Sequence, residues 1–205
     1  QGAETDEHIE NATVLFVDIP SYAGVAERLD AQELAELVKR FYGNANDTVH
    51  LFGAHHMRFV GEALLAVFAQ EGDSRTVNHG LRAARAALGL VDSARGIQEY
   101  LKLRYATRQL PSFAVNVALH TGPVTMALLR DPLHGSATQV LPVGDTVSAA
   151  MLLQKQGRTM GWPIAASVAT LRMVTGAVTT GGRALLDLPG RSAPIDAVEL
   201  VGLVS

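Results

Sequence analysis

The stretch ATVLFVDIPSYAGVAERLDAQELAELVKRF, residues 12–41, decides the fold. It begins with an apolar run rich in β-forming residues, Ala12–Val17, which predicts a buried strand that ends at Asp18. The pair Pro20-Ser21 breaks this strand, because proline has no backbone N–H for the ladder. An acidic residue therefore stands at the point where a buried strand turns.

The second half of the same stretch predicts a long helix. Asp30 and Glu33 have the spacing of a capping box. Apolar residues then recur at i, i+3, i+4 and i+7, as on one face of an amphipathic helix. We expect this helix to run from about Ala31 to the region of His50.

The rest of the chain alternates hairpins and helices. Gly61-Glu62 lies between two β-rich runs and predicts a tight hairpin. The expected elements are strands Met57–Val60 and Ala63–Phe68, helix Ser74–Tyr105, strand Phe113–His120, a turn at Thr121–Pro123, strand Val124–Leu129, a polar loop Asp131–Ala137, helix Asp145–Gln156, strand Ile164–Ala166, helix Val168–Met173, and strands Ala184–Leu188 and Ala197–Leu203. This order predicts an α+β fold with a mostly antiparallel sheet flanked by helices.

We expect one domain over residues 12–205, preceded by a flexible polar lead-in over residues 1–11. The Gly-, Ser- and Pro-rich segment 175–195 is interpreted as a flexible flap. The start at Gln1, without Met or an apolar leader, suggests a piece of a longer chain.

Composition excludes several kinds of function. The net charge of −3 has no run of one sign and argues against a nucleic-acid partner. The absence of cysteine excludes disulfides, thiolate metal sites and cysteine nucleophiles, and it fits a cytoplasmic location. No apolar run approaches the roughly 20 residues of a membrane span. The domain could still be the cytoplasmic part of a longer, membrane-bound protein.

Asp18 and Glu62 are the candidate metal ligands. Adjacent strands of one sheet would bring the two carboxylates to the same edge. Hard oxygen ligands of this kind suit Mg²⁺ or Mn²⁺, with nucleotide phosphates completing the shell. Taken alone, the pair is better explained as a turn cap and an exposed hairpin residue.

Four segments together change this interpretation. The stretch 12–41 resembles the opening of class III adenylate and guanylate cyclase domains. RFVGEALLAVF (58–68), ALHTGPV (118–124) and VGDTVSAAMLL (143–153) are similar to three later motifs of that family, in the same order. The resemblance covers roughly residues 12–175 and implies the ferredoxin-like class III nucleotidyl cyclase fold.

The resemblance also implies a function and a partner. In that family two chains pair head to tail, and each active site lies between them. One chain supplies two metal-binding carboxylates, and the other supplies base-reading residues with an Asn and an Arg. The reaction is attack of the ribose 3′-hydroxyl of a nucleoside triphosphate on the α-phosphate, which yields a cyclic nucleotide and pyrophosphate.

On the metal side this chain keeps most of the pattern. By the resemblance, Asp18 matches the first metal ligand, and Ile19 matches the residue whose carbonyl also ligates metal. Glu62 replaces the second Asp, and its extra methylene moves the carboxylate by about 1 Å, which costs on the order of 100-fold. Arg58 replaces the base-reading Lys and keeps its charge with a different geometry.

On the partner side three positions depart from the pattern. Leu141 stands at the base-discriminating position, Ser148 at that of the Asn, and Leu152 at that of the Arg. Losing a transition-state cation typically costs about 10²- to 10⁵-fold. The expectation is a degenerate cyclase domain that signals through dimerisation, with residual binding of nucleotide and metal.

Two alternatives remain. The chain is the metal-bearing half of a heterodimeric cyclase, or it is an active, divergent homodimer in which Gln154, Lys155 or Arg158 replaces the missing Arg. All three hypotheses predict an apolar dimer interface that includes helix 145–156 and a hairpin over Thr121–Leu129. The arginines of the long helix, Arg82, Arg85 and Arg95, are expected to form a solvated face.

Overall fold

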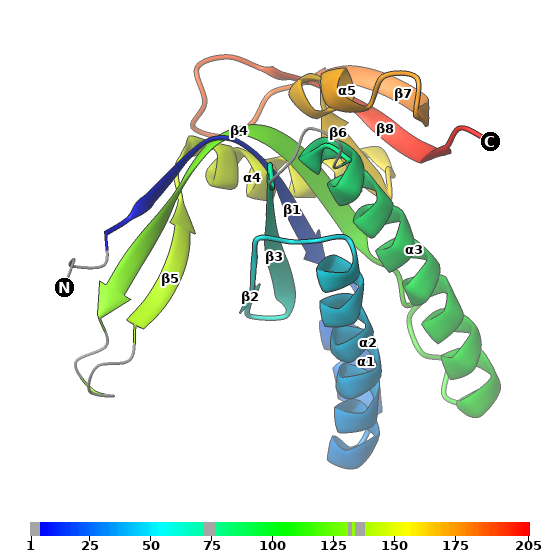
Figure 1. The fold of residues 1–205 in the computed structure, drawn as a ribbon. Coiled ribbons are helices and arrows are strands. Elements are labelled where there is room, and N and C mark those ends of the chain that lie inside the picture. The colour runs from blue at the N-terminus through cyan, green and yellow to red at the C-terminus, as the bar shows by residue number, and fades with distance from the viewer. Residues whose placement is uncertain (1–4, 72–76, 131–132, 134–137) are drawn as a thin grey trace.

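The computed structural model describes residues 5–71, 77–130, 133 and 138–205. Thirteen elements follow one another in these parts of the chain (Figure 1): β1 (Glu7–Asp18), α1 (Tyr22–Arg28), α2 (Ala31–Leu51), β2 (His56–Val60), β3 (Ala63–Ala69), α3 (His79–Arg104), β4 (Asn116–Arg130), β5 (Thr138–Val143), α4 (Asp145–Met160), β6 (Ile164–Ser167), α5 (Val168–Val174), β7 (Val178–Leu186) and β8 (Ile195–Leu203). No helix of the described residues is long and apolar enough to cross a bilayer.

The strands form one sheet in the order β2-β3-β1-β4-β6-β8-β7, with β5 paired to β4. Every pairing is antiparallel except that of β4 with β6. The predicted α+β class and mostly antiparallel sheet are therefore confirmed. The β4–β5 hairpin and the start of β1 extend together away from the body of the domain (Figure 1).

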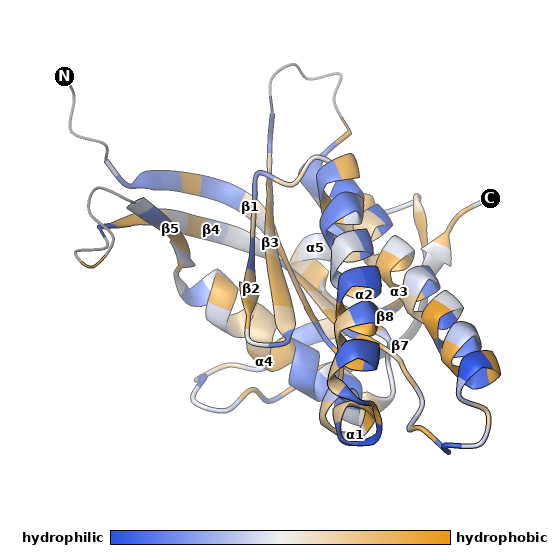
Figure 2. Cartoon of the chain, turned by 90° about the horizontal axis from the view of Figure 1, so that it is seen from below, coloured by the Kyte–Doolittle hydropathy of each residue, from blue (hydrophilic) through white to orange (hydrophobic). Residues whose placement is uncertain are grey.

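Helices cover both faces of the sheet. On one face α2 buries apolar residues that pack with α3 over β1 and β3, whereas much of the side of α2 in view in Figure 2 is hydrophilic. On the other face α4 packs Val147 and Ala150 against Val14 and Phe16 of β1. Since alternate residues of a strand point to opposite faces, both residue sets of β1 and β3 are buried and their sequences read as continuous apolar runs.

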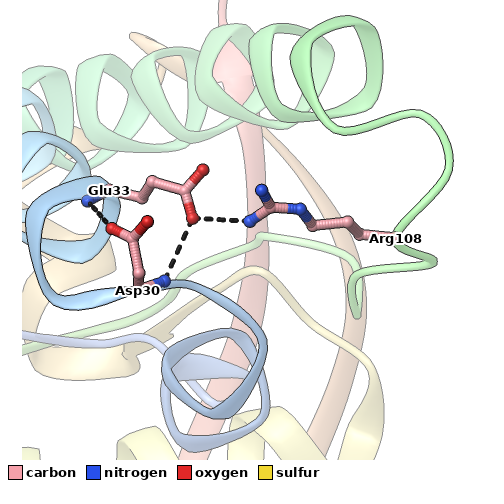
Figure 3. Close-up of polar contacts among 3 residues, drawn as sticks. All are labelled: Asp30, Glu33 and Arg108. Carbon is pink, nitrogen blue, oxygen red and sulfur yellow. Dashed lines mark hydrogen bonds and ion pairs between the residues drawn. The ribbon is translucent and has the colours of Figure 1, made fainter.

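The predicted capping box at the start of α2 is confirmed (Figure 3). The Asp30 carboxylate accepts from the Glu33 N–H at 2.8 Å, and the Asp30 N–H donates to the Glu33 carboxylate at 3.0 Å. Arg108 also donates to Glu33 at 2.5 Å. This bond and that from Asp30 lower the pKa of Glu33 to about 2. Arg108 thereby ties the segment after α3 to the first turn of α2.

Several parts of the chain differ from the predictions. Strand β1 begins at Glu7, so residues 7–11 of the expected lead-in are strand, because they pair with the extended β4. A short helix, α1, occupies Tyr22–Arg28, for which no element was predicted. Strand β7 covers much of the expected 175–195 flap. The expected loop Asp131–Ala137 lies outside the described residues except for Leu133.

The predicted turn at Thr121–Pro123 is wrong. Strand β4 runs unbroken through it, and the returning strand is β5. Gly122 serves a close approach, since a Cβ there would lie 2.6 Å from the Thr146 hydroxyl of α4. Pro123 faces the bulge of β1 between Ile9 and Ala12, where a strand tolerates a residue without an N–H.

A chain of buried and partly buried side-chain hydrogen bonds crosses the middle of the sheet. It joins His79 at the start of α3 to His120 on β4 through four hydroxyl groups. The successive contacts are His79 Nδ1–Thr13 Oγ1 (2.7 Å), Thr13–Thr121 (2.9 Å), Thr121–Thr170 (2.8 Å), Thr170–Ser167 (3.4 Å) and Ser167–His120 Nδ1 (2.7 Å). His120, predicted as the last residue of a strand, is thus a hydrogen-bonded residue inside the longer strand β4.

Burial of His79 makes the fold sensitive to acid. His79 is 2% exposed. Its burial, and then the nearby charge of Arg82, lower its pKa from 6.5 to about 4. The unfolded chain therefore binds a proton that the folded chain rejects as the pH falls from 6.5 towards 4. We expect the free energy of unfolding to decrease by about 2 kcal/mol between pH 7 and pH 5.

Urea unfolding at pH 7, 6 and 5 checks this expectation, with His79→Gln as the comparison. The variant should be less stable at pH 7, because the Thr13 contact changes, and its stability should vary less with pH. Equal pH dependence of the two chains would show that another group is responsible. His56 and His120, whose pKa values are also lowered by burial, remain in both chains.

Candidate functional site

The structure brings Asp18 and Glu62 to the same edge of the sheet. Asp18 ends β1, and the residue before it, Val17, pairs with Leu64 of β3. Glu62 lies in the β2–β3 turn, two residues before Leu64. Because β1 and β3 are neighbouring strands, the end of β1 and the β2–β3 turn lie at the same edge of the sheet, as the hairpin pattern predicted.

Asp18 has a structural contact and remaining ligand capacity. Its Oδ1 accepts a hydrogen bond from the Ile19 N–H at 2.7 Å, so it does cap the turn. The Ile19 carbonyl accepts from the Tyr22 N–H at 3.1 Å as α1 begins. A carboxylate has about four lone-pair directions and a carbonyl has two, so both groups retain acceptor positions.

The turn after Asp18 also carries a buried hydroxyl. Ser21 Oγ has no hydrogen-bond partner among the described residues and makes no cap bond to α1. The neighbouring Pro20 has no N–H to offer a ligand. Ser21 is thus the residue of this turn with an unused side-chain donor.

The oxygen ligands at this edge suit a divalent cation in type but are few. Carboxylate and carbonyl oxygens are the ligands that Mg²⁺ and Mn²⁺ accept. Within the described ranges there is no cluster of three or more His, Asp or Glu side chains arranged to hold a metal. Asp18, Glu62 and the Ile19 carbonyl would hold a cation only together with ligands from outside the chain, such as phosphate oxygens or water.

Tyr42 of α2 is a residue of this site that sequence reasoning missed. Its hydroxyl donates a hydrogen bond to the backbone carbonyl of Glu62. Burial raises the pKa of Tyr42, and electrostatic repulsion between its ionised form and the nearby acidic groups, which include Glu62 and Asp18, raises it further. A cavity of about 260 Å³ beside the turn is lined by Tyr22, Val38, Tyr42, Phe59, Gly61 and Glu62.

Arg58 and His56 lie on one face of β2, because they are two residues apart. They pair with Leu65 and Val67, which belong to the core on the α4 side of the sheet. Arg58 Nε and His56 Nε2 are buried without a hydrogen-bond partner in the described structure. Burial lowers the pKa of His56, and the charge of Arg58 lowers it further.

Ser148 and Leu152 lie one turn apart on α4 and share a face of this helix. Ser148 is exposed, whereas Leu152 packs partly against the apolar cluster around Leu153 and Trp162. Leu141 lies on β5, four residues before α4, and pairs with Ala127. The three positions that the resemblance marked as departures from the family pattern therefore lie along one continuous segment, β5 to α4.

Of the three expected substitutes for the missing Arg, one lies on the same face. Lys155 follows Ser148 by seven residues and is exposed. Gln154 is 3% exposed, and its amide donates to the Asn116 carbonyl at 3.5 Å, so it faces inward. Arg158 is exposed on a different side of the helix.

Comparisons with known proteins agree with this fold. The family model of the adenylate and guanylate cyclase catalytic domain matches residues 4–176. The chain is 22% identical over 196 residues to Adenylate cyclase 1 of Rhizobium meliloti (strain 1021). This alignment covers 95% of the chain and 28% of that protein. The chain therefore spans little more than a quarter of that relative's length.

Two solved structures show the same fold. The guanylate cyclase domain from Catenaria anguillulae in complex with GTP has a TM-score of 0.75 and 20% identity, over 97% of this chain and 100% of that one. A non-canonical dimeric guanylyl cyclase domain from Blastocladiella emersonii has a TM-score of 0.73 and 18% identity, over 97% and 99%. With the family match over most of its length, the chain belongs to the adenylate and guanylate cyclase catalytic domain family.

Proposed function

We propose that this domain is a catalytically degenerate cyclase domain that acts by pairing with another cyclase-like chain and retains a weak site for a divalent cation and a nucleoside triphosphate. One observation carries the proposal. Leu141, Ser148 and Leu152 follow one another along β5 and α4, and none of them offers the amide or guanidinium that the resemblance implies there. The carboxylates Asp18 and Glu62, by contrast, are present at one edge of the sheet.

The retained half of the site supports binding more than turnover. A divalent cation held by Asp18 and Glu62 would neutralise charge on triphosphate oxygens. Arg58 would supply a fixed positive charge from β2, and the Ser21 hydroxyl a hydrogen-bond donor. Turnover also requires stabilisation of the charge that develops in the transition state, and an aliphatic side chain at position 152 cannot provide it.

Pairing is supported by the shape of the domain and by its relatives. The β4–β5 hairpin projects from the body (Figure 1), and it exposes Leu129 and Val143 by 47% and 36%. A solved relative with this fold is described as dimeric. We propose that the β4–β5 hairpin and α4 form the contact with the second chain, a revision of the Thr121–Leu129 hairpin expected from sequence.

A heterodimeric cyclase is the second candidate. The asymmetry between intact carboxylates and the altered α4 face favours this alternative, because a partner that carries the Asn and Arg would complete one active site. Lys155, on the same face as Ser148 and Leu152, is the residue on which an active homodimer would depend.

A product assay tests the proposal. The purified chain is incubated with ATP, GTP, CTP or UTP and with Mn²⁺ or Mg²⁺, and cyclic products are measured by mass spectrometry. We expect no product above that of Asp18→Asn, a control that removes the charge and can still accept the Ile19 N–H. Robust synthesis by the chain alone, lost in this control, would overturn degeneracy.

Binding and assembly are measured on the same samples. Mn²⁺ with GTP or ATP should bind to the wild-type chain and about 10-fold or more weakly to Asp18→Asn. Sedimentation velocity should show a monomer–dimer equilibrium that depends on concentration. A monomer at every concentration, alone and with cyclase chains from the same organism, would contradict pairing.

A further inference from the structure

We propose that Tyr42 is a positioning residue for Glu62, holding the β2–β3 turn so that the Glu62 carboxylate is presented beside Asp18. This inference rests on the proposed cation site and assigns it a further residue. In this proposal Tyr42 is not a ligand of the cation or of the nucleotide. It acts on the backbone from which one ligand projects.

The hydrogen bond from Tyr42 reaches a group that the sheet leaves unpaired. Val60 pairs with Ala63, so Gly61 and Glu62 form a two-residue turn beyond the last ladder pair. Carbonyl groups in such a turn face outward and lack a strand partner. The Tyr42 hydroxyl donates to the carbonyl of Glu62, and thereby links the turn to helix α2.

The Tyr42 ring is itself fixed by neighbouring aromatic side chains. It meets Phe59 of β2 edge to face, with ring centroids 5.4 Å apart and an interplanar angle of 83°. It meets Phe41 in the same manner at 5.1 Å and 78°, and Phe41 is buried in the core. A ring held on two sides presents its hydroxyl in a defined direction, which a flexible side chain would not do.

The turn has little other support. The cavity of about 260 Å³ lies beside it, between α2 and the hairpin. At Gly61, with φ of +61°, no atom lies within 4 Å of the position that a Cβ would occupy. Without the phenolic hydroxyl, the turn can therefore shift towards the cavity or towards solvent.

A fixed backbone is useful at Glu62 because the side chain itself is flexible. Glu62 has one more rotatable bond than the Asp expected at this position, so its carboxylate explores a larger volume. A displacement of about 1 Å in a ligand group costs on the order of 100-fold in function. Fixing the backbone at Glu62 offsets part of this added freedom, and the hydrogen bond from the Tyr42 hydroxyl ends on that backbone.

Tyr42→Phe is the direct test, because it removes only the hydroxyl and keeps both ring contacts. Mn²⁺ affinity is measured by electron paramagnetic resonance titration, with Mn²⁺ alone and with Mn²⁺ and GTP. We expect affinity to fall about 10-fold, as for other groups that orient metal ligands. Tyr22→Phe, which alters another tyrosine lining the same cavity, should stay within about twofold of the wild type.

A double-mutant cycle separates positioning from a general loss of stability. In the Glu62→Gln background, Tyr42→Phe should have no further effect on Mn²⁺ affinity, because the group that it positions no longer binds. A drop that persists in that background would overturn the proposal, as would unchanged affinity in the single variant. If the wild-type chain binds no Mn²⁺, the proposed cation site fails as well, and the inference fails with it.

Discussion

The double variant Ser148→Asn/Leu152→Arg should form cyclic nucleotide at least about 100-fold faster than the wild-type chain. The reason is electrostatic: a guanidinium placed where charge develops in the transition state is worth about 10²- to 10⁵-fold. Both positions lie on one face of α4, so the new side chains project together. The product assay with Mn²⁺ and ATP or GTP measures the gain.

The packing of Leu152 permits this change. Leu152 is partly buried against an apolar cluster, and the aliphatic stem of Arg can cover the same surface while its guanidinium reaches solvent. Leu152→Lys with Ser148→Asn is the matched control, because Lys supplies charge without the planar fork. It should gain less than the Arg variant.

Adding Asp18→Asn to the double variant should abolish the gain, which would tie activity to the carboxylate edge. A double variant that folds, pairs and still yields no product would contradict the assignment of positions 148 and 152 as the missing groups. Wild-type activity that disappears in Lys155→Ala would instead support the divergent homodimer.

The elements that sequence predicted well are those with strong local signals. The α2 helix carries its capping box and apolar stripe within one short stretch, and both appear as expected. The two carboxylates were placed at one edge because the hairpin at Gly61-Glu62 fixes which strand ends meet. In these cases the controlling interactions lie within a few residues or one strand pairing.

The predictions that failed did so because of contacts between residues that are distant in the sequence. Thr121-Gly122-Pro123 reads as a turn, yet its glycine admits Thr146 of α4 and its proline faces a bulge of β1. Neither partner is near in sequence. The contact of Tyr42 with the turn could not be predicted from the sequence either, because its hydrogen bond ends on a backbone carbonyl twenty residues away. Residue type and spacing do not report such contacts.

The contacts of Arg82 are the clearest case of an interaction that the sequence could not predict. With Arg85 and Arg95 this residue was expected to form a solvated face of α3, and for Arg82 this is wrong. Its guanidinium donates to four backbone carbonyls at the junction of α2, β3 and α3. The acceptors are Gly53 (2.7 Å), Val77 (2.9 Å), Phe52 (3.3 Å) and Ala69. Phe52 and Gly53 follow the end of α2, Ala69 ends β3, and Val77 lies just before α3, so one side chain joins three elements.

Arg82→Ala should lower the free energy of unfolding by about 3 to 4 kcal/mol. Hydrogen bonds to a charged group contribute about 1.5 to 3 kcal/mol each and are not additive, and partly buried carbonyls would lose their donor. The Arg82 cation also faces the end of α2, where a positive charge is favourable. Urea unfolding at pH 7 measures the loss.

Two further variants make this prediction specific. Arg95, on the same helix, is 74% exposed and forms one exposed ion pair, with Asp92 at 3.4 Å, so Arg95→Ala should change stability by less than about 0.5 kcal/mol. Arg82→Lys should fall between the two, because an ammonium cannot span several carbonyls at once. Equal stability of Arg82→Ala and Arg95→Ala would mean that water replaces the guanidinium at no cost, and that the junction of α2, β3 and α3 is held by apolar packing alone.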